Sequence, residues 1–398
     1  MSDSLWVIGV AMTKFMRYKD KDLIDLGSEA ATAALADAGL TIFDADILAA
    51  GCLYDTNGIG QRLQKQIGQT GIPVYNVTNA CATGATAFRV AAMAIKAGEA
   101  SIGLAVGLEQ MGKVGLLGAR PAPKDRAYEP AGRYGAVGPV EGVLGTSLMP
   151  GTFAQSGMEY AYLHDGVGFE QFASVAEKNH AHSTLNPLAQ YQKAFSLEEI
   201  MAAEMIAYPN TLLMCCPTGD GAAAAVLCSG ERLKSLPADV QKRAVKVSAS
   251  VMTSDPYVDG GSVQFDVNTL TRQAADKAYE QAGVSPQDLD LVELHDCFAT
   301  AELRHYDNLR LCPDGGAGEW IDKRGPWRDG QIPVNVSGGL LSKGHPLGAT
   351  GIANIYEVAT HLRGEAGDRQ IEGAKVGLTH VIGLGSACAV HILEKAAA

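Results

Sequence analysis

The residues of this chain that are suited to nucleophilic chemistry lie in short Gly-rich motifs. Cys81 stands in Asn79-Ala-Cys-Ala-Thr-Gly84, between a strand-like run over residues 74–77 and a long Ala-rich helical pattern. A thiol at a helix start gains from the positive end of the helix dipole, which lowers its pKa, and small neighbours leave room for a substrate. We therefore predict that Cys81 is a nucleophile on a strand-to-helix turn.

A candidate base lies in the second half of the chain. His345 stands in the Gly-dense segment 338–351, which opens a second Ala-rich helical pattern over residues 349–362. The seven residues from Cys81 (Cys-Ala-Thr-Gly-Ala-Thr-Ala) match the seven from His345 (His-Pro-Leu-Gly-Ala-Thr-Gly). If the two halves pack about a pseudo-twofold axis, the helix starts meet, and the imidazole faces the thiol as its base.

Two further motifs supply polar groups for the same site. In Glu293-Leu-His-Asp-Cys-Phe298, His295 and Cys297 alternate at the end of a strand pattern, so both side chains are predicted to point to one side. The second motif is Gly383-Leu-Gly-Ser386, a turn whose backbone N–H groups are free to bind an oxyanion.

The elements that must position these motifs also occur twice. A helix pattern ending at Gly39 and another ending at Gly283 are each followed by a short loop and a strand pattern. Strands and helices alternate in both halves, which predicts two parallel α/β units. Between them, residues 111–210 break the alternation, with helices expected over 169–179 and 196–205. A buried strand is expected over 220–228. The second half is expected to begin near Val245.

Composition excludes several classes of protein. Of the 398 residues, 47% are apolar and 19% charged, which indicates a compact globular chain of two or three domains. The net charge is −12, from 32 basic and 44 acidic residues, and no dense basic run suggests nucleic-acid binding. No apolar run is long enough for a membrane span. No signal peptide, transit peptide or peroxisomal tripeptide is recognised, so we expect a cytoplasmic protein.

The eight cysteines form no Cys-x-x-Cys pair, which predicts free thiols in a reducing compartment. The His180-Ala-His182 pair lacks converging Cys or carboxylate ligands, so no metal site is expected.

Taken together, the motifs resemble those of the thiolase superfamily, specifically its sterol-carrier-protein-x (SCP2) type. The resemblance covers nearly the whole chain and includes Cys215-Cys-Pro-Thr-Gly-Asp-Gly221 and Leu362-Arg-Gly-Glu-Ala-Gly367. It implies an α/β thiolase fold with two duplicated βαβαβαββ core domains in a five-layer αβαβα sandwich. The first core domain would comprise residues 1–111 and 211–244, the inserted loop domain 112–210, and the second core domain 245–398.

The resemblance also implies roles for the site residues. Cys81 would be the acylated nucleophile, activated by His345, and the N–H groups of Cys81 and Gly385 would form one oxyanion hole. His295 stands where most thiolases have an Asn that holds a water in the other oxyanion hole. The second catalytic Cys of ordinary thiolases is replaced here by Gly383-Leu-Gly385, and the proton-transfer role passes to Cys297. Cys388 lies in a strand pattern and is assigned to the core.

The implied activity is that of a thiolase, an acyltransferase of lipid metabolism. It would cleave 3-ketoacyl-CoA with CoA to acetyl-CoA or propionyl-CoA and a shortened acyl-CoA, or run the reverse Claisen condensation. CoA and acyl-CoA are substrates, no cofactor is held permanently, and a homodimer or homotetramer is expected. Candidate substrate contacts are five basic residues of the insertion and one methionine: Lys113, Arg120, Lys124, Arg126, Arg133 and Met158.

Two alternative functions remain open at this point. One is a thiolase-like acyltransferase or side-chain retro-aldolase that works with a small OB-fold-type partner subunit. The other is a non-catalytic acyl-CoA- or lipid-binding protein. The presence of Cys81, His295, Cys297 and His345 argues against both.

Overall fold

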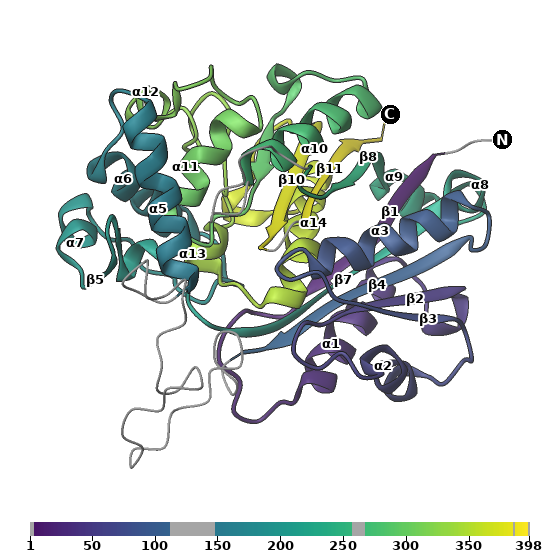
Figure 1. Ribbon diagram of the computed structural model, residues 1–398. Coiled ribbons are helices and arrows are strands. Elements are labelled where there is room, and N and C mark those ends of the chain that lie inside the picture. The colour runs from purple at the N-terminus through teal and green to yellow at the C-terminus, as the bar shows by residue number, and fades with distance from the viewer. Residues whose placement is uncertain (1–3, 112–147, 257–266, 385–386, 397–398) are drawn as a thin grey trace, which may run out of the picture.

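The computed structural model describes residues 4–111, 148–256, 267–384 and 387–396 (Figure 1). The hydrogen-bonded strands run in the order β3-β2-β4-β7-β1-β8-β11-β10-β9. The strands of the first half are β1 (Leu5–Met12), β2 (Ile47–Gly51), β3 (Val74–Val77), β4 (Ile102–Gln110) and β7 (Asp220–Ser229). Those of the second half are β8 (Val245–Thr253), β9 (Leu291–Glu293), β10 (Val376–Gly383) and β11 (Ala387–Lys395).

The two halves repeat one topology, as the internal sequence matches predict. Outward from the antiparallel β1–β8 junction, β1, β7, β4 and β2 correspond to β8, β11, β10 and β9. In each half the two inner pairs are antiparallel, and the next pair, β4–β2 or β10–β9, is parallel. In the second half, a parallel bridge between Val292 of β9 and Val334 takes the place that the β2–β3 pairing has in the first half. The mirrored order is that of two duplicated units related by a pseudo-twofold axis.

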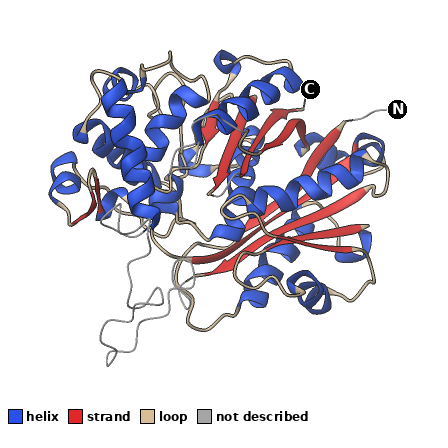
Figure 2. Ribbon diagram, in the orientation of Figure 1, coloured by secondary structure: helices blue, strands red, loops and turns tan. Residues whose placement is uncertain are grey.

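Helices cover both faces of the strands (Figure 2). On the outer side, α1 (Leu23–Asp37) and α2 (Ile59–Ile67) pack on the first half, and α10 (Val267–Ala282) packs on β8 and β11. Between the halves lie α3 (Thr83–Lys96) and α14 (Leu347–Arg363), which contact each other and strands of both halves. The result is a sandwich of helices, strands, helices, strands and helices, with apolar cores between the layers.

Local sequence explains how these elements begin and end. Asp22 accepts hydrogen bonds from two backbone N–H groups at the start of α1. Gly39 and Gly283 adopt φ values of +67° and +70° after α1 and α10, which is the left-handed conformation expected of a glycine that ends a helix. The Ala-rich β7 is buried along almost its whole length, so helices approach closely from both sides.

The segment between β4 and β7 contains α5 (Leu148–Leu163), α6 (Phe169–Ser183), α7 (Leu197–Ala202) and the hairpin β5 (Met205–Ala207) and β6 (Asn210–Thr211). The helix predicted over 196–205 is therefore wrong at its end, because residues 205–207 pair with β6. The remaining helices are α8 (Gly230–Lys234), α9 (Ala238–Arg243), α11 (Ala299–Asn308), α12 (Ala317–Asp322) and α13 (Gly339–Lys343). No helix of the described ranges has the length and apolar character needed to cross a membrane.

The first turns of α3 and α14 touch through their backbones. A Cβ atom on Gly84 would lie 2.6 Å from the carbonyl oxygen of Gly348, and one on Gly351 would lie 2.3 Å from the amide nitrogen of Ala85. A Cβ on Gly348 would lie 2.3 Å from the carbonyl oxygen of Leu108. Only glycine fits at these positions, so the two halves meet at the helix starts that carry Cys81 and His345.

Replacing Gly84 with Ala should force these helices apart. We expect Gly84→Ala to lower the free energy of unfolding by about 1–3 kcal/mol, because backbone atoms cannot yield as side chains do. Urea unfolding followed by fluorescence measures the change. The control is Gly103→Ala in β4, where a new Cβ would meet only side-chain atoms, the nearest at 3.2 Å. Equal stability losses in the two variants would contradict the backbone contact.

Candidate active site

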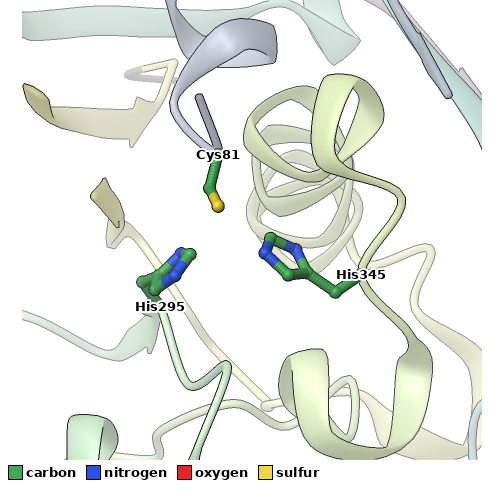
Figure 3. A group of neighbouring side chains, drawn as sticks. All are labelled: Cys81, His295 and His345. Carbon is green, nitrogen blue, oxygen red and sulfur yellow. The ribbon is translucent and has the colours of Figure 1, made fainter. Parts of the chain in front are cut away.

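A cavity of about 300 Å³ opens between the two halves, and four of the predicted site residues line it: Cys81, His295, Cys297 and His345. Cys81 comes from the first half and the other three from the second. The sulfur of Cys81 and one ring nitrogen each of His295 and His345 all lie within 4.8 Å of one another (Figure 3). Among the described residues, no other group of Cys, His and acidic side chains converges in this way.

Cys81 is held on a tight turn between β3 and α3. Ala80, just before it, has φ +47°, a left-handed conformation that is unfavourable for a residue with a side chain. The Thr83 hydroxyl accepts from the N–H of Asn79 (2.8 Å) and donates to the carbonyl of Ala80 (2.6 Å), which closes the turn. Gly383 packs so closely that a Cβ there would lie 2.4 Å from the Asn79 carbonyl oxygen. These contacts fix where the thiol points.

The hydrogen bonds of His345 define which of its nitrogens carries the proton. Nδ1 lies 2.8 Å from the hydroxyl of Thr350, and that hydroxyl donates its own hydrogen to the carbonyl of Pro346 at 3.0 Å. Nδ1 must therefore be the donor to Thr350, which leaves Nε2 without a hydrogen. Nε2 is buried and has no protein partner. The imidazole thus offers a free lone pair in the group formed with Cys81.

The resting thiol and imidazole are both neutral. Burial raises the pKa of Cys81 to about 12, although the N–H groups of Leu384 and of Cys81 itself act in the opposite direction. Burial lowers the pKa of His345 to about 3. The net pKa of the thiol is therefore raised, contrary to the expectation that the helix start would lower it. Among the described residues the cavity lining carries no Lys, Arg, Asp or Glu, so desolvation outweighs the helix dipole.

Cys297 follows His295 in an extended segment, and both line the cavity as their alternation predicts. The carbonyl of Cys297 accepts from the N–H of Cys216 at 3.0 Å, which brings a second thiol-bearing segment alongside. Burial raises the pKa of Cys297 well above its usual value, with Cys216 and Cys81 adding smaller effects. Cys297 therefore keeps its proton at neutral pH.

Asp296 anchors this segment from behind. One carboxylate oxygen accepts from the N–H of Leu340 (2.7 Å), and the other from the N–H of Leu341 (3.2 Å) and the side-chain amide of Asn179 (2.8 Å). The same amide nitrogen of Asn179 donates to Glu302 at 2.6 Å, and Glu302 forms a fully buried ion pair of 2.8 Å with Lys178. A buried ionic network therefore supports the backbone that carries His295 and Cys297.

Other predicted positions have different outcomes. Met158 does not line the cavity and is 39% exposed, whereas Met149, Pro150 and Phe153 of the same helix do line it. Five residues beyond Phe153 a helix has turned by about 140°, so Met158 points elsewhere. The basic residues Lys113, Arg120, Lys124, Arg126 and Arg133, and Gly385, lie outside the described residues.

The two histidines considered for a metal are occupied by hydrogen bonds. His180 contacts the carbonyl of Leu213 and the hydroxyl of Ser342, and His182 contacts the carbonyl of Asn335 and the N–H of Arg328. Cys388 is buried in β11, as assigned.

Sequence reasoning missed most of the cavity wall. The wall includes Cys215, Cys216 and Phe298, and apolar side chains from segments far apart in the chain: Leu53, Met111, Met149, Phe153, Ile206, Leu212, Leu347 and Leu384. An antiparallel bridge between Cys215 and Phe298 places the thiols of Cys215 and Cys216 at the cavity. Nothing in the sequence pairs these two segments.

The raised pKa of Cys81 predicts how the thiol reacts with iodoacetamide. Because the thiolate is the reactive form, alkylation should be slow at neutral pH and still rising near about pH 10. Peptide mass spectrometry measures the rate at Cys81, with N-acetylcysteine in the same tube as an internal standard. A Cys81 rate that levels off near neutral pH would show a thiolate and contradict the neutral pair.

The buried ion pair predicts a large loss of stability in Lys178→Met. The change leaves the Glu302 carboxylate buried without its cation, which should cost about 3–5 kcal/mol of unfolding free energy. The control is Lys323→Met, which removes an exposed ion pair with Glu319 and should change the stability far less. Denaturant unfolding compares the two variants, and similar midpoints would refute the supporting role.

Both halves of the chain are similar in sequence to known proteins. The chain matches the family models "Thiolase, N-terminal domain" over residues 5–133 and "Thiolase C-terminal domain-like" over residues 264–395. It is 39% identical to sterol carrier protein 2 of Homo sapiens over 98% of this chain and 72% of that one. It is 36% identical to an acetyl-CoA acetyltransferase of Methanothermobacter thermautotrophicus over 98% and 99% of the two chains.

Solved structures show the same fold. The Ltp2-ChsH2(DUF35) aldolase superposes with a TM-score of 0.81 at 22% identity, over 99% of this chain and 98% of the other. The sequence matches extend over both halves and include the segments that carry Cys81, His295 and His345. The chain belongs to the thiolase family.

Proposed function

We propose that this protein is a thiolase that cleaves 3-ketoacyl-CoA with CoA, or runs the reverse condensation, through an acyl-enzyme on Cys81. The observation that carries the proposal is that the Cys81 sulfur and a ring nitrogen of His345 lie within 4.8 Å of each other, while Nε2 is the His345 nitrogen that carries no hydrogen. A nucleophile and its base, contributed by opposite halves, are what covalent acyl transfer needs. The acetyl-CoA acetyltransferase relative supports the same reaction class.

The first step follows from the neutral resting pair. Cys81 passes its proton to Nε2 of His345 as its sulfur attacks the 3-keto carbon of the substrate. The bond between C2 and C3 then breaks, and its electron pair forms the enolate of acetyl-CoA. The N–H now present on Nε2 of His345, together with His295, donates to the enolate oxygen. Donors fixed in an apolar cavity stabilise such an anion more than water does.

The second step requires an acid near C2 of the enolate. Cys297 lines the cavity and keeps its proton, so it is suited to protonate this carbon and release acetyl-CoA. The CoA thiol then enters, gives its proton to the Cys297 thiolate, and attacks the thioester on Cys81. The shortened acyl-CoA leaves, and the proton on His345 returns to Cys81. Each group ends in its starting state, and the reverse path is the Claisen condensation.

The apolar cavity wall supports an acyl substrate. Phe153 and Phe298 stack with ring centroids 5.1 Å apart, and aliphatic and Met side chains complete the lining. CoA and acyl-CoA are the substrates in this proposal, and a homo-oligomer and a cytoplasmic location remain predictions. A retro-aldolase with a partner subunit is the competing function, since the aldolase shares the fold. The pair of Cys81 and Cys297 favours thiolysis, because only thiolysis needs both a nucleophile and a second thiol acid.

Thiolysis of a panel of 3-ketoacyl-CoAs, from short straight-chain to 2-methyl-branched and steroid-derived, tests the proposal. We expect Cys81→Ala to lower kcat/KM by at least about 10³-fold. Cys297→Ala should lower kcat by about 10²–10⁴-fold, because the carbanion loses its acid. The control is Cys388→Ala, a buried cysteine outside the cavity, which should keep nearly full activity.

Two results would overturn the proposal. One is cleavage by the unmutated protein that survives in Cys81→Ala. The other is no cleavage of any substrate by a folded protein that forms no adduct at Cys81; activity that appears only with an added DUF35-type subunit would then favour the aldolase.

A further inference from the structure

Cys81, His295 and His345 form a set of donors that a metal ion could use as well as a substrate. The Cys81 sulfur and one ring nitrogen of each histidine all lie within 4.8 Å of one another, and Figure 3 shows the three side chains pointing toward a common space. The two imidazole rings are nearly perpendicular, at 81°, with centroids 5.1 Å apart. A tetrahedral Zn²⁺ ion needs such donors about 3.3–3.8 Å apart, so inward side-chain movements of about 1 Å or less would complete the site. No metal site was expected from the sequence, because these ligands come from three segments that lie far apart in the chain.

The donor types determine which metal ion fits. Thiolate sulfur and imidazole nitrogen are ligands that Zn²⁺ prefers, whereas Mg²⁺ and Ca²⁺ prefer oxygen ligands. Among the described residues, the cavity lining has no carboxylate to attract a hard cation and no Lys or Arg to repel a divalent one. The three protein ligands leave the fourth position of a tetrahedral ion to a water, for which the cavity of about 300 Å³ has room. The site therefore suits Zn²⁺ rather than Mg²⁺ or Ca²⁺.

Buried polar groups hold the two histidines in place from behind, as is usual for metal ligands. Nδ1 of His345 donates to Thr350 at 2.8 Å, so Nε2 has the free lone pair that a metal ion requires. Glu293 and Lys343 precede His295 and His345 by two residues each. The side chains of Glu293 and Lys343 form a fully buried ion pair at 3.4 Å. This pair connects the two segments that carry the histidines, so both are held near each other before a ligand enters.

We propose that Cys81, His295 and His345 form a Zn²⁺ site whose occupation blocks the reaction at Cys81. The thiol releases its proton to solvent as the sulfur binds the ion, and each imidazole donates a lone pair, so one proton is released for each Zn²⁺ bound. The metal then holds the sulfur electrons that would attack a substrate, and His345 has no lone pair left to accept a proton. This inhibition rests on the proposed function, whereas the metal site rests on the geometry of the three side chains.

Titration of the metal-free protein with Zn²⁺, in competition with a chromophoric chelator, measures the site directly. We expect one Zn²⁺ per chain. Its affinity should fall at least about 100-fold in Cys81→Ala, His295→Asn and His345→Asn, because the loss of even an outer partner of a metal ligand costs about 10- to 100-fold. The control is Cys312→Ala, which removes a half-buried thiol outside the cavity and should leave the affinity unchanged. Unchanged affinity in the three cavity variants, or its loss in Cys312→Ala, would overturn the proposal.

Co²⁺ in place of Zn²⁺ reports which donors hold the ion, because its absorption spectrum depends on ligand type and geometry. The Co²⁺ form of the unmutated protein should show the intense visible bands of a tetrahedral ion and a thiolate-to-cobalt charge-transfer band in the near ultraviolet. The charge-transfer band should be lost in Cys81→Ala. A spectrum typical of six oxygen ligands in the unmutated protein would contradict the site. This readout decides the question even if the histidine variants do not fold.

Protection of Cys81 separates the metal site from the proposed function. With free Zn²⁺ set by a metal buffer at about 100 times its Kd, only about 1% of the sites stay empty. Alkylation of Cys81 by iodoacetamide and thiolysis of a 3-ketoacyl-CoA should then both slow about 100-fold, and a chelator should restore both. Alkylation that Zn²⁺ does not slow would overturn the proposal. If Zn²⁺ protects Cys81 in a protein that cleaves no 3-ketoacyl-CoA, the metal site stands and the proposed function fails.

Discussion

The backbone contact between α3 and α14 is the constraint on which the site depends. Gly84, Gly348 and Gly351 let the two helices touch without side chains between them. Because each helix belongs to a different half, this contact also sets the distance between the halves. The residues that precede the two helices, Cys81 and His345, are then carried to within reach of each other. A larger side chain at the contact would push apart the two helices that these residues precede.

The apolar cavity determines how the site must work. Desolvation keeps the Cys81 thiol and the His345 imidazole neutral, so in the proposed reaction the proton moves as the sulfur attacks. The hydrogen bond from Nδ1 of His345 to Thr350 then determines that Nε2 is the His345 nitrogen without a hydrogen. Buried polar groups of the second half therefore position the chemistry without entering the cavity.

The sequence predicted the repeated parts of the fold well, because short local rules govern them. The helical pattern predicted over 349–362 lies within α14 (Leu347–Arg363), and Gly39 and Gly283 end their helices as expected. The repeat match between Cys81 and His345 was enough to predict that they meet. The pKa of Cys81 was not predictable, because it depends on desolvation by walls that come from distant segments, such as Leu53 and Phe153. The hairpin at 205–211 was missed for a similar reason, since its strand pairing outweighs local helix preference.

Trapping the acyl-enzyme tests the central claim most directly. The protein would be incubated with a short 3-ketoacyl-CoA without free CoA, quenched in acid, digested and analysed by mass spectrometry. The account predicts an acyl group on the peptide that contains Cys81, and its disappearance when CoA is added before the quench. A stable adduct on Cys297 or Cys216 instead, or product formation with no acylated cysteine, would contradict the account.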